Sequence, residues 1–258
     1  AFDVIDVGGG HDGTEAAAAS ARMGARAALI THSAKTVGEM SCNPASGGLA
    51  KGQLVREIDA MGGLMGLASD ATGIHFKVLN QSRGPAVRGP RCQSDKVAYA
   101  RTVRDMIAAR PEIDVIAGSV DDLLIEDDIC TGCIVSPATL RVPLPMGTCG
   151  AQREVERRSH HETLESETPT EPVTLRSPAT ILTTGTFMRG LMHTGDDKPP
   201  GGRHGEAPAV GISATLTRLG FELGRLKTGT PPRVKKDSLD WDNLEPDRGD
   251  ETPTPFSD

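Results

Sequence analysis

The chain has 258 residues, of which 37% are apolar and 24% are charged, with five cysteines. This composition excludes collagen-like chains, wholly disordered chains and small disulfide scaffolds, and the length suffices for one large or two small buried cores. No stretch reaches the roughly 20 apolar residues that a membrane helix needs, and no signal segment opens the chain. We therefore expect a soluble, cytoplasmic protein that contacts no membrane. We expect both ends to be cut, because Ala1 leads directly into a strand and residues 254–258 form no recognisable terminal element.

The net charge of −7 is unevenly spread along the chain. Residues 77–104 hold seven Lys or Arg and one Asp, so this stretch is basic while the rest is strongly acidic. A basic stretch on an acidic protein favours a surface that faces a polyanion such as RNA. The alternative is a solvated surface whose cations pair with acidic neighbours. The low aromatic content of 3% argues against a surface that stacks bases on aromatic rings.

The N-terminal thirty residues predict a strand, a glycine turn, a helix and a second strand. Residues 2–7 are β-prone, residues 13–23 are rich in Ala and other helix formers, and residues 27–31 form a short apolar run. This order is that of a βαβ unit. Asp6 is discordant within the first strand, because a buried carboxylate without a partner is costly. We expect Asp6 to have a partner or to lie near the sheet edge.

The later elements are predicted from periodicity and from turn residues. The segment 136–176 is rich in Pro, Glu, Thr and Ser, and is expected to be an exposed, largely disordered insertion. The other predicted elements, in chain order, are helices at 53–61 and 95–109, strands at 114–117, 121–125 and 178–184, a Pro/Gly-rich crossing at 198–203 and a helix at 211–219.

A glycine-rich motif joins the first strand to the first helix. It reads Gly8, Gly9, Gly10, His11, Asp12, Gly13 and fits G-x-G-x-x-G in the strand–turn–helix context that dinucleotide binding requires. In that motif the first glycine permits the tight turn, the second admits a pyrophosphate and the third lets helix and strand pack closely. The alternative is a purely structural turn. The acidic residue that usually binds the ribose is missing, since residues 31–33 are Thr-His-Ser.

The cysteines give weaker signals of function than the glycine motif. Cys42 lies in a loop of small residues, 41–52, where a thiol could ionise and act as a nucleophile. The alternative is a small buried apolar residue. Cys130 and Cys133 have the spacing of half a metal or redox site, but no second pair accompanies them, and we expect no metal.

Longer runs carry a family resemblance that goes well beyond the glycine motif. The runs are residues 2–17, residues 40–44 (Met-Ser-Cys-Asn-Pro), residues 83–88 (Arg-Gly-Pro-Ala-Val-Arg) and residues 224–233 (Gly-Arg-Leu-Lys-Thr-Gly-Thr-Pro-Pro-Arg). They closely resemble the N-terminal portion of the MnmG (GidA) family, the flavoprotein subunit of the tRNA wobble-uridine 5-carboxymethylaminomethyl modification enzyme. The resemblance covers nearly the whole chain except residues 136–176.

The resemblance implies an FAD site, a catalytic thiol and a tRNA surface. FAD would bind at the glycine motif, with further contacts at Val120, Gly185 and Pro200, and Cys42 would be one of two catalytic cysteines. NADH would reduce the flavin, and methylenetetrahydrofolate would supply the one-carbon unit. The residues expected to face tRNA are Arg83, Arg88, Arg91, Lys96, Arg101, Lys227 and Arg233.

The resemblance also implies a GTPase partner, MnmE, and a homodimer in the full-length form. The expected fold is α/β: an incomplete Rossmann-like FAD-binding domain with the start of an inserted second dinucleotide or substrate domain. The expected divisions are 1–135 and 177–198 for the FAD-binding domain, 136–176 for the insertion and 199–258 for the truncated NADH or substrate domain.

Departures from the family pattern leave alternatives open. Family chains are more than twice as long, and the second cysteine is missing, so the fragment alone is expected to be inactive. Pro200 replaces a polar residue near the flavin, and Asp12 replaces a small one. The chain could therefore be a truncated, non-catalytic remnant that binds nucleotide or RNA. A generic FAD- or NADH-linked oxidoreductase acting on a small molecule is a third reading, and the long family motifs argue against it.

Overall fold

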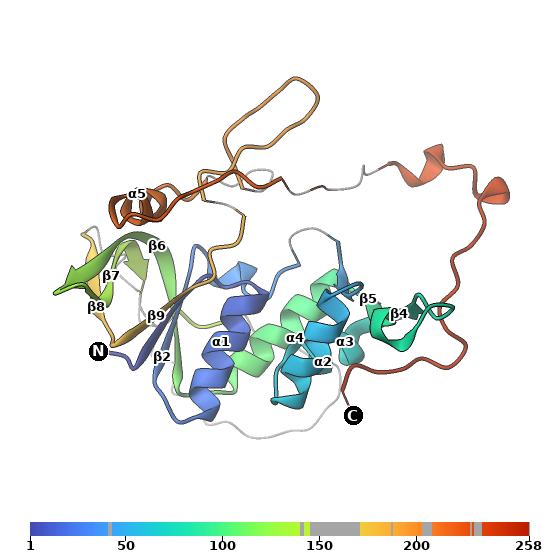
Figure 1. Ribbon diagram of the computed structural model, residues 1–258, viewed down its shortest axis with the longest axis horizontal. Coiled ribbons are helices and arrows are strands. Elements are labelled where there is room, and N and C mark those ends of the chain that lie inside the picture. Colours follow the sequence, from blue (N-terminus) through green and yellow to red (C-terminus); the bar gives the residue numbers. More distant parts are fainter. Residues whose placement is uncertain are drawn as a thin grey trace.

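The computed structural model describes residues 1–40, 43–139, 142–144, 171–186, 188–202, 208–227, 229 and 234–257. Two sheets and five α-helices form within these residues (Figure 1). The helices are α1 (His11–Arg22), α2 (Lys51–Ala60), α3 (Met65–Thr72), α4 (Lys96–Ala108) and α5 (Gly211–Arg218). The strands are β1 (Val4–Val7), β2 (Ala27–Thr31), β3 (Ala45–Gly47), β4 (Gly73–Leu79), β5 (Gly89–Ser94), β6 (Ile113–Glu126), β7 (Ile129–Thr139), β8 (Val173–Arg176) and β9 (Ala179–Leu182).

The larger sheet has the strand order β8-β7-β6-β2-β1-β9. Strands β6, β2, β1 and β9 run parallel, whereas β7 and β8 extend the sheet antiparallel. The chain leaves β1 through α1 to reach β2 on one side, and later returns to place β9 on the other side of β1. The predicted βαβ unit and the α/β class are confirmed.

Alternating side chains place one apolar layer on each face of this sheet. Leu29 and Val115 pack toward α1 and α4, while Ile30 and Ile116 pack toward the other face. On that other face Ile212 of α5 joins the same cluster. Figure 1 shows α1 and α4 side by side, with α5 near the far end of β6. The helix pair α1 and α4 therefore covers one face. On the other face α5 packs against apolar side chains of β6, β7 and β8.

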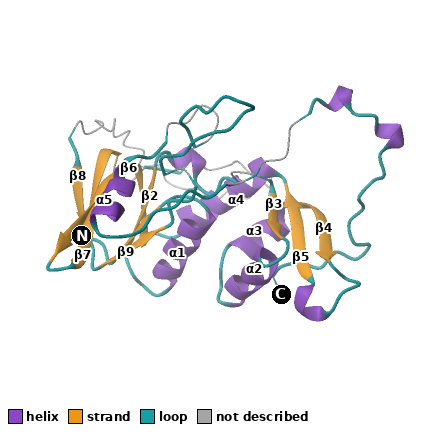
Figure 2. Ribbon diagram, turned by 45° about the horizontal axis from the view of Figure 1, so that its top comes forward, coloured by secondary structure: helices purple, strands orange, loops and turns teal. Residues whose placement is uncertain are grey.

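The smaller sheet, in the order β3-β5-β4, is fully antiparallel and packs against α2 and α3 (Figure 2). Its core is an apolar cluster of Val55, Met65, Cys92 and Phe256, with Phe76 against it. Phe256 comes from the C-terminal tail, residues 245–257, and its side chain is completely buried. The tail is thus part of this core although it lies nearly 200 residues from α2.

Further contacts fix the end of the tail. The Asp70 carboxylate accepts hydrogen bonds from the backbone N–H groups of Phe256 and Ser257, at 2.9 and 2.8 Å. The Arg56 guanidinium donates to the carbonyl of Phe256 at 2.7 Å. Figure 1 shows the red tail passing beneath β4 and β5 to the C-terminus.

Several sequence predictions differ from the structure. The strands predicted at 114–117 and 121–125 are one continuous strand, β6. Its first part pairs with β2, and pairing with β7 extends it without a break through its second part. The segment 136–176, expected to be exposed and disordered, contributes its ends to β7 and β8, and its Leu144 is buried against the α1–α4 layer. Residues 140–141 and 145–170 lie outside the described residues.

Asp6 does not fulfil the expectation of a partner or an edge position. It lies on β1, between β2 and β9, and is completely buried. Neither carboxylate oxygen has a hydrogen-bond partner within the described structure. Burial raises the pKa of Asp6 to about 7.

The expected second domain, residues 199–258, remains a prediction. Two of its described parts contact the first: α5 packs on β6, and Phe256 packs with α2 and β5. On the described part of the chain, no helix is long and apolar enough to cross a membrane.

Candidate functional site

The glycine motif forms a turn too tight for side chains at its first and third glycines. Gly8 has a φ of +124°, and a Cβ there would overlap the Thr183 carbonyl. A Cβ at Gly13 would overlap the carbonyl oxygen of Gly8, so α1 can approach the end of β1 closely only because residue 13 is glycine. The first and third glycines therefore have the structural roles that the motif predicts.

The second glycine is different, because it faces open space. A Cβ at Gly10 would meet nothing within 4 Å, and the residue is exposed. Its φ and ψ of −79° and −165° are accessible to any residue. Nothing in the fold itself thus explains a glycine at position 10, whereas a ligand that approaches the backbone would.

The N-terminus of α1 opens onto this space. Gly10 is the N-cap residue, and no side chain caps the helix. The first N–H groups of an α-helix have no partner within the helix, and the helix dipole adds partial positive charge there. The backbone of residues 11–13 can therefore donate hydrogen bonds to an anion such as a diphosphate.

Thr183, just after β9, completes the turn and was missed by the sequence analysis. Its backbone N–H and its hydroxyl both donate to the Val7 carbonyl, each at 2.9 Å. The ends of β1 and β9 are thereby held together at the point where the chain changes direction in the sheet. Ligands of open α/β sheets bind at such switch points. The signal was available, since Thr183 ends the apolar run that pairs with the first strand.

His11 follows the open glycine and carries no charge near neutral pH. Burial, followed by the charge of Lys51, lowers the pKa of His11 to about 4. Its ring stands edge-on to the ring of Tyr99, with centroids 5.6 Å apart. An anion at the turn would accordingly be bound by backbone N–H groups and not by a cationic imidazole. Asp12 is exposed.

Polar groups after β2 occupy the position where an acidic residue usually binds the ribose. His32 is exposed, whereas the Ser33 hydroxyl accepts a hydrogen bond from the Lys35 backbone. Lys96, predicted to face tRNA, lies beside this loop, 3.6 Å from the carboxylate of Glu39. The structure therefore places Lys96 beside the loop that follows β2 and not on the β4–β5 hairpin.

The other predicted cofactor contacts are scattered. The Val120 side chain is buried in the apolar cluster on the α5 face. Gly185 is exposed at a φ of +65°, two residues after Thr183. Pro200 pairs with Leu191 in the excursion 188–202. Gly185 alone of these three is close in sequence to a residue that contacts the turn, and all three roles remain predictions.

The loop that follows the predicted thiol is strained at Ala50. Cys42 itself lies outside the described residues. Ala50 has a φ of +62° and a ψ of −55°, and the Lys51 N–H donates to the Leu49 carbonyl at 2.8 Å. This is the uncommon γ-turn with positive φ. Strain of this kind clusters at functional sites.

The predicted RNA-facing residues fall into three groups. Arg83 and Arg88 are exposed on the connection between β4 and β5, and Arg91 is half-buried on β5. Arg101 is exposed on α4, and Lys227 is exposed in an extended segment. Arg233 lies outside the described residues. The hairpin group is the set of cations that the fold brings together.

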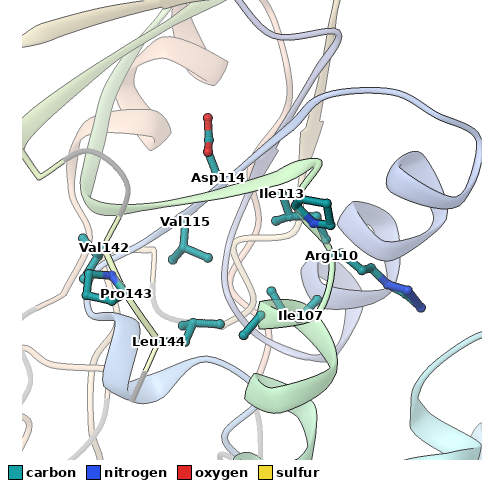
Figure 3. Close-up of a pocket in the computed structure, with 10 residues that line it drawn as sticks. Ile107, Arg110, Ile113, Asp114, Val115, Val142, Pro143 and Leu144 are labelled. Carbon is teal, nitrogen blue, oxygen red and sulfur yellow. The ribbon is translucent and has the colours of Figure 1, made fainter. Parts of the chain in front are cut away.

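A cavity of about 370 Å³ lies away from the glycine turn (Figure 3). It is lined by the end of α4, the start of β6 and residues 142–144, where the parallel strands begin, whereas the glycine turn lies where β1 ends. Figure 3 shows apolar side chains around it, with Asp114 and Arg110 pointing away from its centre. Because no polar groups converge there, we assign it no role.

Among the described residues, no group of three or more His, Cys, Asp or Glu could hold a metal ion. Cys130 and Cys133 lie on β7 and are free thiols. Burial raises the pKa of Cys133 to about 12, which makes it an inert thiol.

Comparison with known proteins identifies the family. Residues 3–258 match the model of the GIDA family, described as glucose inhibited division protein A. The chain belongs to the GIDA family. The resemblance to MnmG (GidA) seen in the sequence is thereby confirmed.

Relatives and a solved structure agree with this assignment to GIDA. A protein of Granulibacter bethesdensis named tRNA uridine 5-carboxymethylaminomethyl modification enzyme MnmG is 48% identical over 257 residues, which are 100% of this chain and 36% of the relative. The protein of the same name from Rhodopirellula baltica is 44% identical over 256 residues, 99% of this chain and 36% of the relative. The crystal structure of Aquifex aeolicus GidA superposes with a TM-score of 0.81 at 39% identity, over 99% of this chain and 37% of that one. The chain thus spans little more than a third of these GIDA relatives.

Proposed function

We propose that the glycine turn binds the diphosphate of FAD and that this chain supplies the nucleotide-binding part of a tRNA-modifying flavoprotein. The observation that carries the proposal is the contrast within the motif. Gly8 and Gly13 are required by packing, whereas Gly10 faces open space at an uncapped helix N-terminus. The residues present therefore fit a diphosphate, which needs close backbone approach and N–H donors.

FAD, when bound, would supply hydride-transfer chemistry. The chain's own residues would bind and orient it. The N–H groups of His11, Asp12 and Gly13 would donate to phosphate oxygens. The exposed His32 at the end of β2 would take the place of the missing acidic residue beside the ribose. Thr183 would hold the β1 and β9 ends at a fixed spacing.

Replacing Gly10 by Ala tests this site. The change adds one methyl group to open space, so the fold should be unaffected while the space for the diphosphate is lost. Gly84→Ala is the matched control, since a Cβ there also meets nothing within 4 Å and its φ of −64° suits alanine. We expect FAD affinity, measured by flavin fluorescence titration, to fall at least about tenfold in Gly10→Ala and to be unchanged in Gly84→Ala. Equal affinities, or a colourless wild-type chain that takes up no FAD, would refute the proposal.

In the full-length protein we propose the reaction that the relatives' name describes. The substrate would be the wobble uridine of tRNA, with NADH as reductant and methylenetetrahydrofolate as one-carbon donor, in a cytoplasmic homodimer that works with the GTPase MnmE. Cys42 would be the nucleophile. These assignments follow from the family and from the motifs that carry it. Cys42→Ser in a full-length version should abolish wobble-uridine modification in cells while FAD stays bound.

The basic hairpin would contact the tRNA backbone. Arg88 is exposed just before β5, and Arg91 lies on β5. Reversing both charges should weaken binding of a tRNA transcript and flatten its salt dependence. Binding curves identical to those of the wild type would show that the hairpin is an ordinary solvated surface.

A further inference from the structure

The side chains of Lys77, Arg91 and His75 share the outer face of the small sheet. Phe76 and Cys92 are register partners that point into the apolar core, so their neighbours Lys77 and Arg91, also register partners, point to the opposite face. His75 lies two residues before Lys77 on β4 and points the same way. Gly47 of β3 flanks Arg91 on the other side and adds no side chain. We call His75, Lys77 and Arg91 the cation trio.

One carboxylate of the tail occupies the trio. Asp247 accepts a hydrogen bond from the Lys77 ammonium, and its carbonyl oxygen lies 3.2 Å from His75 Nε2. The Lys77 hydrogen bond comes first, followed by the charges of Lys77, His75 and Arg91, in lowering the pKa of Asp247. Lys77 of the trio thus already binds one carboxylate, while His75 lies against the backbone carbonyl of the same residue.

The tail is fixed just after Asp247 by contacts that do not involve this carboxylate. Asp250 accepts a hydrogen bond from the Val78 N–H at 2.8 Å and donates its own N–H to the Phe76 carbonyl at 2.9 Å, which covers the open edge of β4. Phe256 is buried in the core. Asp247, three residues before Asp250, is therefore held near the trio at high effective concentration.

The contact at Asp247 is nonetheless exposed. The Asp247 side chain is 68% exposed and the Lys77 side chain 34%. Ion pairs in such positions contribute little to stability, so they can exchange with another oxyanion. Arg83 and Arg88, exposed on the same hairpin, extend the positive surface beyond the trio.

We propose that the cation trio is a phosphate subsite for the RNA backbone, and that Asp247 occupies it as an intramolecular competitor which a phosphate displaces. The proposal deepens the proposed function and rests on it. The carboxylate would lower non-specific binding of polyanions. A tRNA held also by Arg83 and Arg88 would still displace it.

Asp247→Asn tests the competition, with Asp242→Asn as its matched control. Asp242 lies in the short 3-10 helix η4 (Trp241–Asn243), is exposed, and its replacement changes the net charge by the same amount. Binding of an unmodified tRNA transcript is measured at 50 and 200 mM salt. Because the bound phosphate displaces Asp247, both Asn variants make the same number of phosphate contacts in the complex, and their salt slopes should be alike. Asp247→Asn should bind the transcript about two- to fivefold more tightly than Asp242→Asn, because no surface ion pair has to be broken first, and Lys77→Gln in the Asp247→Asn background should remove this advantage.

Equal affinities of the two Asn variants at both salt concentrations, while the wild type binds tRNA, would overturn the competition and leave the proposed function intact. Absence of tRNA binding by all variants would overturn both. A second experiment measures the binding of inorganic phosphate to the same variants, with chloride at matched ionic strength as the reference anion. Tighter binding of inorganic phosphate by Asp247→Asn without tighter tRNA binding would assign the trio to free phosphate and contradict the RNA subsite.

Discussion

The buried carboxylate of Asp6 makes a quantitative prediction about stability and pH. It lies in the interior of the parallel sheet with no partner for either oxygen among the described residues, and its pKa is about 7. In an unfolded chain the pKa of Asp is about 3.9. The folded state therefore holds this proton more tightly, and its contribution to stability is present in full below about pH 4 and is lost as the pH rises to 7.

The size of the effect follows from that difference. Each pKa unit corresponds to about 1.4 kcal/mol, so ionisation of Asp6 costs the fold about 4 kcal/mol above pH 7. Asp6→Val removes the charge and suits a β-strand between two apolar neighbours. We expect the variant to gain stability over the wild type, with a gain about 3 kcal/mol larger at pH 8 than at pH 5.

Urea unfolding followed by circular dichroism at the two pH values measures this gain. Glu57→Gln, which removes an exposed carboxylate on α2, is the control for loss of one negative charge, and its stability difference from the wild type should be the same at both pH values. An Asp6→Val gain that is equal at pH 5 and pH 8 would refute the reasoning, because it would show that Asp6 does not change protonation in this range.

Two further substitutions test the small sheet and its loop. Ala50→Gly should stabilise the chain by about 1 kcal/mol in urea unfolding, because glycine adopts a positive φ without the cost that alanine pays; an unchanged or lower stability would contradict the strained γ-turn. Phe256→Ala should cost about 3–5 kcal/mol, because it empties a core position. A loss below about 1 kcal/mol in thermal or urea unfolding would show that the tail is not part of that core.

The sequence predicted those parts of the fold that are encoded locally. The βαβ unit follows from two apolar runs and a glycine turn within thirty residues. Helices α2 and α4 follow from their apolar faces, and both begin or end within two residues of the prediction. The motif also predicted the roles of Gly8 and Gly13, since a G-x-G-x-x-G spacing has one physical explanation at each position.

Local sequence patterns do not predict contacts between residues that lie far apart in the chain. The small sheet was missed because β4 and β5 alternate poorly and contain Gly and Pro, and their partner in the core, Phe256, lies far along the chain. Asp6 was expected to have a partner because most buried carboxylates do. Among the expected RNA contacts, Lys96 pairs with Glu39, a contact that no local pattern could reveal.

Amide hydrogen exchange with and without FAD tests the central claim most directly. If the diphosphate binds the N-terminus of α1, exchange at His11, Asp12 and Gly13 should slow when FAD is added. The first-turn amides of α4, which already donate to the Asp95 carboxylate, should not change. Protection that leaves residues 11–13 untouched, or none anywhere, would contradict the assignment of the flavin to this turn.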